Sequence, residues 1–562
     1  MMRIALLIFS ILSFSDWSVL VLPARAQGDF IRQRETNPNY QEGDWVSYSV
    51  ARFITSIAVG QQYVYFGTRH SGIIRLDQYQ YRWDFPWTTS NGLADNQVWS
   101  VAYDHESGFL WCASHRAISY YQPTAHKWHN YFKDEFGLPF NDEIESIGIG
   151  PRKIYFQARS GRVLETNKFG GIILVSNSQA GSNGSVRWFG RRAQRQRRFP
   201  NFFMSHGYLF NPEGVVEDFN FRRAEVVAAV EDDWGNLWIG TWGLGAGRGD
   251  LRNLQLDMYE FGLSNFSVQA LTLADEVLWL GGTHSSETQR GITAWDLGRE
   301  TWSTYEQRNI SELRSDQIYA ITADNDDLWF STGYGLVRYS SRKGSWQTFD
   351  SFEGLSDNLV FDAVADDSCV WIATSNGIDR LLKNSLSKKD SVKIKPISPG
   401  NLALTRVRDL ELMENLLWAA TNRGVYVYDT AKRVGGFSDE FEGPITDEIT
   451  SISSYQNELW LGSTDGVDVF DTKKRQWLGV TEGRLLSTSV NKVLATPQAV
   501  WAATNSGVMK FNRKDKTWRK FTVKDGLIDN RVHAILLDGD YIWFGTERGL
   551  TQFYWNDPSR ID

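Results

Sequence analysis

Near its C-terminus the chain reads Tyr541-Ile542-Trp543-Phe544-Gly545-Thr546-Glu547-Arg548-Gly549-Leu550. An apolar residue, a Trp, another apolar residue, a small pair, a polar turn, a Gly and an aliphatic residue follow in that order, and the order recurs along the sequence. The Trp slot is filled by Trp111, Trp238, Trp279, Trp329, Trp371, Trp418, Trp460, Trp501 and Trp543, with Tyr65 and Tyr155 in the same slot. Strand-like units that repeat every ~40–45 residues are the signature of a β-propeller.

One full unit spans residues 518–555 and holds four short apolar segments separated by turns. Gly526-Leu527-Ile528-Asp529-Asn530 and Asp538-Gly539-Asp540 supply the Gly, Asn and Asp that tight turns require. Four short antiparallel strands make one propeller blade. The sequence therefore predicts an all-β fold with a repeat of ~42 residues.

The number of repeats predicts two propellers. The interval from Tyr155 to Trp238 is about two repeats long, so we expect a degenerate copy inside it that ends near Tyr208-Leu209-Phe210-Asn211. Counting that copy gives about twelve four-stranded blades, and propellers typically have about four to eight blades. We therefore predict two β-propellers.

The ends of the repeat array suggest how the propellers close. The segment Trp45-Val46-Ser47-Tyr48 stands without a unit before it, and the last unit ends at Tyr554 without an outer partner strand. In a tandem arrangement, residues 45–48 close the blade of Trp279 and residues 302–305 close the blade of Trp543, which leaves no exposed edge. This favours about six blades over residues 44–298 and about six over 299–562. A nested arrangement, with both termini in one propeller, or a seven-plus-five partition fits the same spacing.

The N-terminus predicts export. Arg3 forms a positive start, residues 4–12 an apolar core, and Ala24-Arg25-Ala26 a small-residue cleavage site, so residues 1–26 are predicted to be a signal peptide cleaved after Ala26. Gln27 follows instead of Cys, which argues against a lipoprotein anchor, and residues 27–43 read as a polar N-terminal arm. We expect a periplasmic or secreted protein.

The repeat resembles the two-component regulator propeller repeat. The resemblance rests on the Gly-Leu-x-x-Asn turn and on copies such as Leu328-Trp329-Phe330-Ser331-Thr332-Gly333-Tyr334-Gly335-Leu336-Val337-Arg338-Tyr339, and it covers nearly all of residues 44–555. In that family such propellers form the periplasmic, ligand-sensing part of membrane sensor kinases, often for saccharide fragments. This sequence shows no kinase and no further membrane segment, so we expect a stand-alone, sensor-like binding protein.

The candidate ligand-binding residues lie in turns at the channel mouth of the first propeller or near them. Propeller ligands bind where the Gly-Leu turns and the turns after the Trp strands converge, and pockets combine apolar faces with a few polar groups. The candidates are Trp242, Arg69, His70, Arg116, Trp87 and Trp99. Trp242 is expected to supply the stacking face for a sugar ring, because it lies in a glycine-rich turn. The alternatives are solvated turn residues and, for the aromatic residues, packing between blades.

No catalytic motif is found, and no enzyme activity, metal or cofactor is expected. The sequence has no His-Glu-x-x-His, no Gly-x-Ser-x-Gly and no clustered Cys and His, and its paired carboxylates, such as Asp232-Asp233, fall in hairpin turns. We therefore predict a ligand- or partner-binding double propeller. The alternatives are an envelope protein-interaction scaffold and a polysaccharide-active enzyme such as a lyase.

The net charge and one cluster of arginines indicate which kinds of partner to expect. The formal net charge of −8 argues against a nucleic-acid binder. The arginines from Arg187 to Arg198 are crowded in an otherwise acidic chain, which is compatible with a contact to an anionic envelope polymer or an acidic partner; the alternative is a solvated insertion. The expected partners are a small molecule, an oligosaccharide or an envelope protein.

Cys112 and Cys369 are the two cysteines, and the repeat places them in different blades. A disulfide needs Cα atoms within about 7 Å of each other, so we predict two free thiols. Under denaturing, non-reducing conditions both should react with a thiol reagent. Detection of an intramolecular Cys112–Cys369 bridge by mass spectrometry would contradict the assignment of the blades.

Overall fold

A computed structural model describes residues 40–176, 185–193, 198–204, 206–283, 291–386, 394–397, 402–437, 448–478 and 488–560. The predicted signal peptide, its cleavage after Ala26 and most of the arm at 27–43 lie outside these residues. Within the ranges given, no helix is long and apolar enough to cross a membrane.

The predicted all-β fold is confirmed, because the strands form eleven antiparallel sheets, most of them four-stranded. Four sheets make a smaller propeller. Its strands are β2 (Ile54–Val59), β3 (Tyr63–Thr68), β4 (Ile73–Asp77), β5 (Trp83–Trp87); β6 (Val98–Tyr103), β7 (Leu110–Ser114), β8 (Ala117–Gln122), β9 (Lys127–Phe132); β10 (Ile144–Ile149), β11 (Lys153–Ala158), β12 (Val163–Asn167), β13 (Leu174–Val175), β14 (Arg187–Gly190); and β15 (Leu209–Phe210), β16 (Val215–Glu217), β17 (Arg223–Glu231), β18 (Asn236–Thr241), β19 (Ala246–Asp250), β20 (Gln255–Tyr259).

The other seven sheets make a larger propeller. Its strands are β21 (Ala270–Ala274), β22 (Val277–Gly281), β23 (Ile292–Asp296), β24 (Thr301–Tyr305); β25 (Ile318–Asp324), β26 (Asp327–Thr332), β27 (Gly335–Ser340), β28 (Ser345–Phe349); β29 (Val360–Ala365), β30 (Cys369–Thr374), β31 (Gly377–Leu382), β32 (Ile394–Pro396); β33 (Val407–Met413), β34 (Leu416–Thr421), β35 (Gly424–Asp429), β36 (Val434–Phe437); β37 (Ile449–Tyr455), β38 (Glu458–Ser463), β39 (Val467–Asp471), β40 (Gln476–Leu478); β41 (Val490–Ala495), β42 (Ala499–Thr504), β43 (Gly507–Asn512), β44 (Thr517–Phe521); and β45 (Val532–Asp538), β46 (Tyr541–Thr546), β47 (Gly549–Tyr554) with β1 (Trp45–Tyr48). The short 3₁₀ helices are η1 (Thr89–Asn91), η2 (Pro123–Ala125), η3 (Lys133–Phe136), η4 (Arg191–Ala193) and η5 (Lys383–Ser385).

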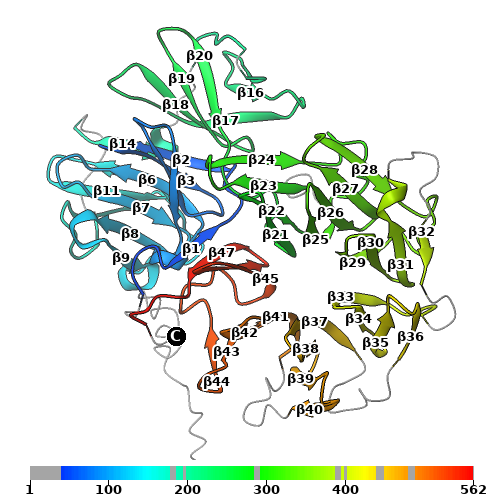
Figure 1. Cartoon of the computed structure of the whole chain (residues 1–562). Coiled ribbons are helices and arrows are strands. Elements are labelled where there is room, and N and C mark those ends of the chain that lie inside the picture. The colour runs from blue at the N-terminus through cyan, green and yellow to red at the C-terminus, as the bar shows by residue number, and fades with distance from the viewer. Residues whose placement is uncertain are drawn as a thin grey trace, which may run out of the picture.

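The inner strands define the two rings. In the smaller propeller β17, β2, β6 and β10 lie side by side in that order. In the larger propeller the inner strands follow in chain order from β21 to β45, and β45 lies beside β21, so this ring is closed (Figure 1).

The expected tandem closure is wrong. The N-terminal strand β1 pairs with β47, with Trp45 opposite Phe553 and Tyr48 opposite Leu550, so it completes the blade of Trp543. The blade of Trp279 is completed by its own β24, where Trp295 lies opposite Trp302. The boundary expected at residue 298 therefore falls in the turn of one hairpin. A short turn brings neighbouring strands together at low entropic cost, which favours β24 over a distant strand. In the sequence, the smaller propeller (β2–β20) is inserted between β1 and β21, and both of these strands belong to the larger propeller.

The degenerate copy expected between Tyr155 and Trp238 does not form a sheet of its own. Strand β14 pairs with β10 of the preceding sheet, and β15 and β16 extend the following sheet through β17. These strands are only two to four residues long. Such short strands bury too little apolar surface to stand as a separate blade.

The Trp slot is used for packing, and in four blades an Asp at the hairpin before it accepts the indole N–H. Trp111, Trp238, Trp329 and Trp501 are completely buried. In four blades the indole N–H donates to an Asp of the preceding turn: Trp238 to Asp232 at 2.8 Å, Trp371 to Asp366 at 2.8 Å, Trp329 to Asp324 at 3.2 Å and Trp543 to Asp538 at 3.3 Å. These turn carboxylates therefore hold the buried Trp residues in place.

The expectation of two free thiols agrees with the structure, in which Cys112 and Cys369 are both buried and unpaired.

The closing strand should contribute strongly to stability. Trp45 is 3% exposed, and its ring stacks on that of Phe553 with centroids 3.8 Å apart. Because removing a buried Trp commonly costs ~3–5 kcal/mol, Trp45→Ala should lower the melting temperature measured by circular dichroism by several degrees. Trp234→Ala is the matched control, since Trp234 is 67% exposed. Equal melting temperatures for both variants and the parent protein would contradict this role of β1.

Candidate functional site

A β-bulge lies at the start of the inner strand in every sheet except that of β21. The pairing of the first two strands shifts register there, as between Ile318 and Ala320 or between Val532 and Ala534. A bulge locally re-aims a side chain. The bulge position is the residue that the shift skips, for example Tyr319. It lies at the end of each ring where the turns after the second strands gather, which we call the mouth.

In the larger propeller these side chains line a central cavity of about 420 Å³. The bulge positions of six blades, together with Gln269 before β21, lie in its wall: Tyr319, Phe361, Arg408, Thr450, Asn491 and His533. Ligand pockets in proteins usually measure about 300–1,000 Å³. The seven-bladed ring therefore holds a cavity of the size of a small ligand.

One side of this cavity is aromatic. Tyr319 and Phe361 come from neighbouring inner strands, and their ring centroids lie 5.4 Å apart at an interplanar angle of 66°. Both side chains are half-buried. They present an apolar surface on which a flat or ring-shaped group can pack.

The opposite side is polar. Asn491 donates through Nδ2 to the carbonyl of Val532 at 2.7 Å, and His533 Nε2 lies 2.9 Å from Glu547 Oε2. Burial lowers the pKa of His533 more than the neighbouring Glu547 raises it, so the imidazole is neutral at neutral pH. Beside the aromatic pair, Arg408 Nη2 lies 2.7 Å from Glu448 Oε1. The wall thus offers an amide, an imidazole and a guanidinium.

A charged network of Asp362, Asp409 and Lys492 also lines the cavity and, with Ser451, joins four blades. Lys492 Nζ contacts Asp409 Oδ1 at 2.8 Å, and Asp409 Oδ2 accepts a hydrogen bond from the Ser451 hydroxyl at 2.8 Å. The backbone N–H of Leu410 donates to Asp362 at 2.9 Å. Burial, and then the charge of Asp409, raise the pKa of Asp362 well above its usual range. Asp362 is therefore protonated in the folded protein where an exposed Asp is ionised.

Three of the residues suggested by the sequence gather at the mouth of the smaller propeller. Trp242, Arg69 and His70 surround Phe53, and the Arg69 guanidinium lies 5.5 Å from the centroid of Trp242. Trp242 is 38% exposed. Burial and the adjacent Arg69 lower the pKa of His70 to about 4.

The other three have different surroundings. Trp87 is 2% exposed, and its indole N–H donates to Glu42 at 3.1 Å. Trp99 occupies the bulge position of β6, and its buried indole N–H has no partner among the described residues. Arg116 pairs with Asp95 at 3.1 Å. None of the six lines the cavity of the larger propeller.

Sequence reasoning missed the residues of the larger cavity. Their signal is a variable position directly after the first, aliphatic residue of the inner strand, as in Val360-Phe361-Asp362-Ala363 and Val407-Arg408-Asp409-Leu410. Alternation alone places this residue on a packed face, and only the bulge turns it toward the cavity.

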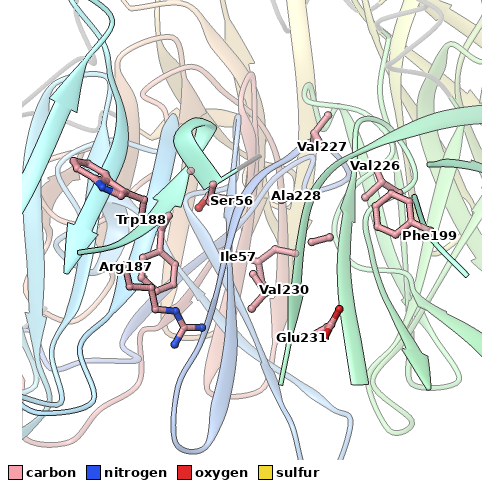
Figure 2. Close-up of a pocket in the computed structure, with 14 residues that line it drawn as sticks. Ser56, Ile57, Arg187, Trp188, Phe199, Val226, Val227, Ala228, Val230 and Glu231 are labelled. Carbon is pink, nitrogen blue, oxygen red and sulfur yellow. The ribbon is translucent and has the colours of Figure 1, made fainter. Parts of the chain in front are cut away.

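The smaller propeller has a cavity of about 280 Å³ between β14 and β17. Strand β14 contacts β2 and β6 and so occupies the middle of this ring. Aliphatic residues of β17, such as Val226 and Val230, form much of the wall, and Arg187 and Glu231 lie toward one end (Figure 2). This cavity is smaller and has fewer polar groups at its wall than the cavity of the larger ring.

No group of His, Cys, Asp and Glu suited to a metal ion occurs among the residues that the structure describes.

Comparison with known proteins agrees with this architecture. The family model of the two-component regulator propeller matches residues 526–548. Among solved structures, the chain is similar to PorZ of Porphyromonas gingivalis, an essential bacterial surface component of the type-IX secretion system. The identity is 13% and the TM-score 0.53, over 91% of this chain and 87% of that one. None of the curated proteins matches.

Two extracellular domains from B. thetaiotaomicron are similar as well. That of the putative hybrid two component system BT4673 gives 15% identity and a TM-score of 0.46, over 89% of this chain and 70% of that one. That of BT3049 gives 17% and 0.44, over 89% and 74%. The fold and the likeness to PorZ define a β-propeller protein. Its last blade carries a two-component regulator propeller repeat, as the sequence resemblance indicated.

The raised pKa of Asp362 predicts that the stability of the folded protein falls as pH rises. Because the unfolded chain ionises this group above pH about 4 while the folded protein keeps it protonated, stability is lost as pH rises toward the folded pKa. In Asp362→Asn the side-chain amide can keep the hydrogen bonds, but it does not titrate. The melting temperature of this variant should equal that of the parent near pH 4 and exceed it at pH 8. The exposed Asp367→Asn in the same blade should show no such trend, and a difference for Asp362→Asn that does not change with pH would contradict the assignment.

Proposed function

We propose that this protein is an exported, non-catalytic double propeller that binds a saccharide-like ligand in the cavity of its larger ring. The observation that carries the proposal is the wall of that cavity, where bulges place the Tyr319 and Phe361 pair across from Asn491 and His533. The proposal moves the ligand site from Trp242 and the smaller propeller to the seven-bladed ring.

The chemistry of the wall supports a polyhydroxylated ligand. A sugar ring has apolar C–H faces that pack on aromatic rings, and hydroxyl groups around its edge that donate and accept hydrogen bonds. The aromatic pair offers the first kind of contact, and Thr450, Asn491 and the neutral His533 offer the second. A cavity of about 420 Å³ accommodates a ligand of one or two sugar rings.

The carboxylates near the cavity support binding over cleavage. A glycosidase or lyase needs acid and base groups that are free to exchange protons with substrate. The protonated Asp362 at the wall accepts the backbone N–H of Leu410. Asp409 is held by Lys492 and Ser451, Glu547 by His533, and Glu448 by Arg408. These pairs keep the carboxylates occupied within the wall.

Export is proposed on the N-terminal sequence, in which a positive start, an apolar core and Ala24-Arg25-Ala26 form a signal peptide pattern. The location supported by this pattern is the periplasm or the medium.

The test begins with a glycan array and continues with calorimetry on the best ligand. Tyr319→Ala and Phe361→Ala should each weaken binding by ~2 kcal/mol, about thirtyfold, because each removes part of a central aromatic anchor. Tyr541→Ala is the matched control, since Tyr541 is 40% exposed on the same ring but lies in the hairpin at the end away from the mouth.

Three outcomes contradict the proposal. Full affinity in both cavity variants would place the ligand elsewhere, and loss of binding in Trp242→Ala alone would return it to the smaller propeller. Release of shortened products from a bound glycan, detected by mass spectrometry, would make the protein an enzyme.

A further inference from the structure

The two mouths carry different chemistry at equivalent positions. In the smaller propeller, arginines occupy the turns after the second strands of three successive blades, at Arg69, Arg116 and Arg159. In the larger propeller the same turns are mixed, with Tyr334, Asn376, Arg423, Asp465, Ser506 and the pair Glu547-Arg548, so arginine occurs in two of these six described turns. A turn whose side chains only face solvent can carry any of these polar residues. The arginines in three successive turns of one ring therefore indicate a role beyond solubility.

A segment far along the chain adds to this concentration. Strand β14 pairs with β10 and carries η4 to the mouth, where Arg191 and Arg159 both contact the carboxylate of Glu145. The Nε of Arg159 lies 2.6 Å from Glu145 Oε1, and Nη1 of Arg191 lies 2.8 Å from Oε2. We call Arg69, Arg116, Arg159 and Arg191 the arginine face.

The carboxylates of the arginine face lie beneath the guanidinium groups. Asp95 is 18% exposed where its partner Arg116 is 41% exposed. Glu145 is 15% exposed, against 55% for Arg159 and 69% for Arg191. At these pairs solvent therefore meets mainly the guanidinium groups, and the partly buried acids fix the positions of Arg116, Arg159 and Arg191, while Arg69 lies over the ring of Trp242. Groups fixed in advance lose less entropy when they bind.

Aromatic side chains stand among these arginines. Trp242 is 38% exposed beside Arg69, and Phe140 is 62% exposed and packs edge-on against His115, with centroids 4.5 Å apart. Arginine and large aromatic residues are enriched in protein–protein interfaces and dominate their binding energy. The four arginines do not line the cavity of the smaller propeller.

We propose that the arginine face is a docking surface for an acidic segment of a partner protein. Its cations lie on separate turns and on η4, so a ligand must offer carboxylates at scattered positions, and the side chains of Asp and Glu can do so. A stiff acidic polysaccharide presents its carboxylates at one regular repeat. Arginine also pairs with carboxylates in a defined, often bidentate geometry. This proposal stands independently of the ligand site in the larger ring.

The probe is a synthetic peptide of glutamate residues, compared with an oligogalacturonate of equal charge and with a glutamine peptide. Affinities are measured by biolayer interferometry at two salt concentrations. The glutamate peptide should bind most tightly and lose affinity as salt rises, because exposed charges are screened. The glutamine peptide should not bind.

The variants use neutral substitutions that preserve the fold. Arg191→Gln leaves Glu145 paired with Arg159, and Arg69 makes no ion pair among the described residues. The double variant Arg69→Gln/Arg191→Gln should lose at least tenfold in affinity for the glutamate peptide, and Arg116→Gln alone should lose less. Arg299→Gln, at a position 84% exposed, and Tyr319→Ala in the other site should bind like the parent.

Either of two results overturns the proposal. The first is unchanged binding of the glutamate peptide by both arginine variants while their melting temperatures match the parent. The second is equal or tighter binding of the oligogalacturonate with the same sensitivity to the substitutions, which would assign the face to an acidic polysaccharide.

Discussion

The pairing of β1 with β47 is the interaction on which the architecture depends. A ring of sheets keeps an exposed edge until its first and last strands meet, and here those strands are separated by almost the whole sequence. The stack of Trp45 on Phe553 and the apolar cluster around it fix this meeting. Gly526 lies so close to Trp45 that a Cβ there would clash with the indole ring, so the Gly of this turn is a packing requirement as well.

The same strand ties the two propellers together. The hydroxyl of Ser47 bonds both Thr551 in the larger ring and Ser90 in the smaller one. The chain then enters the smaller propeller, and Val50 forms a bridge with Gly262, where the chain returns. Two neighbouring connections therefore link the rings, and a cluster that includes Tyr48, Phe53 and Trp302 packs between them. Closing the larger ring also anchors the smaller one.

Blades built on one pattern give the two mouths different side chains. The bulge of the inner strand and the turn after the second strand are the two positions that packing leaves open, and both lie at the mouth. In the larger ring the bulge positions surround an open cavity with aromatic and hydrogen-bonding side chains. In the smaller ring β14 fills the centre, so the exposed turns carry the recognition chemistry instead. The proposed ligand site and the proposed docking surface can then be altered independently.

The sequence by itself determined the fold class, because a Trp slot repeated along the chain is visible without any long-range contact. It also marked Arg69, Trp242 and the arginines after Arg187 as unusual. Tertiary structure decided how the ring closes, since β24 and β1 are equivalent in pattern and differ only in which edge they reach. Tertiary structure also decided that β14 and β15 join separate sheets, and that Arg159 and Arg191 both pair with Glu145. Tyr319 and Phe361 face the cavity only because of a register shift. Alternation along a single strand does not reveal this shift, because a bulge is a relation between two strands.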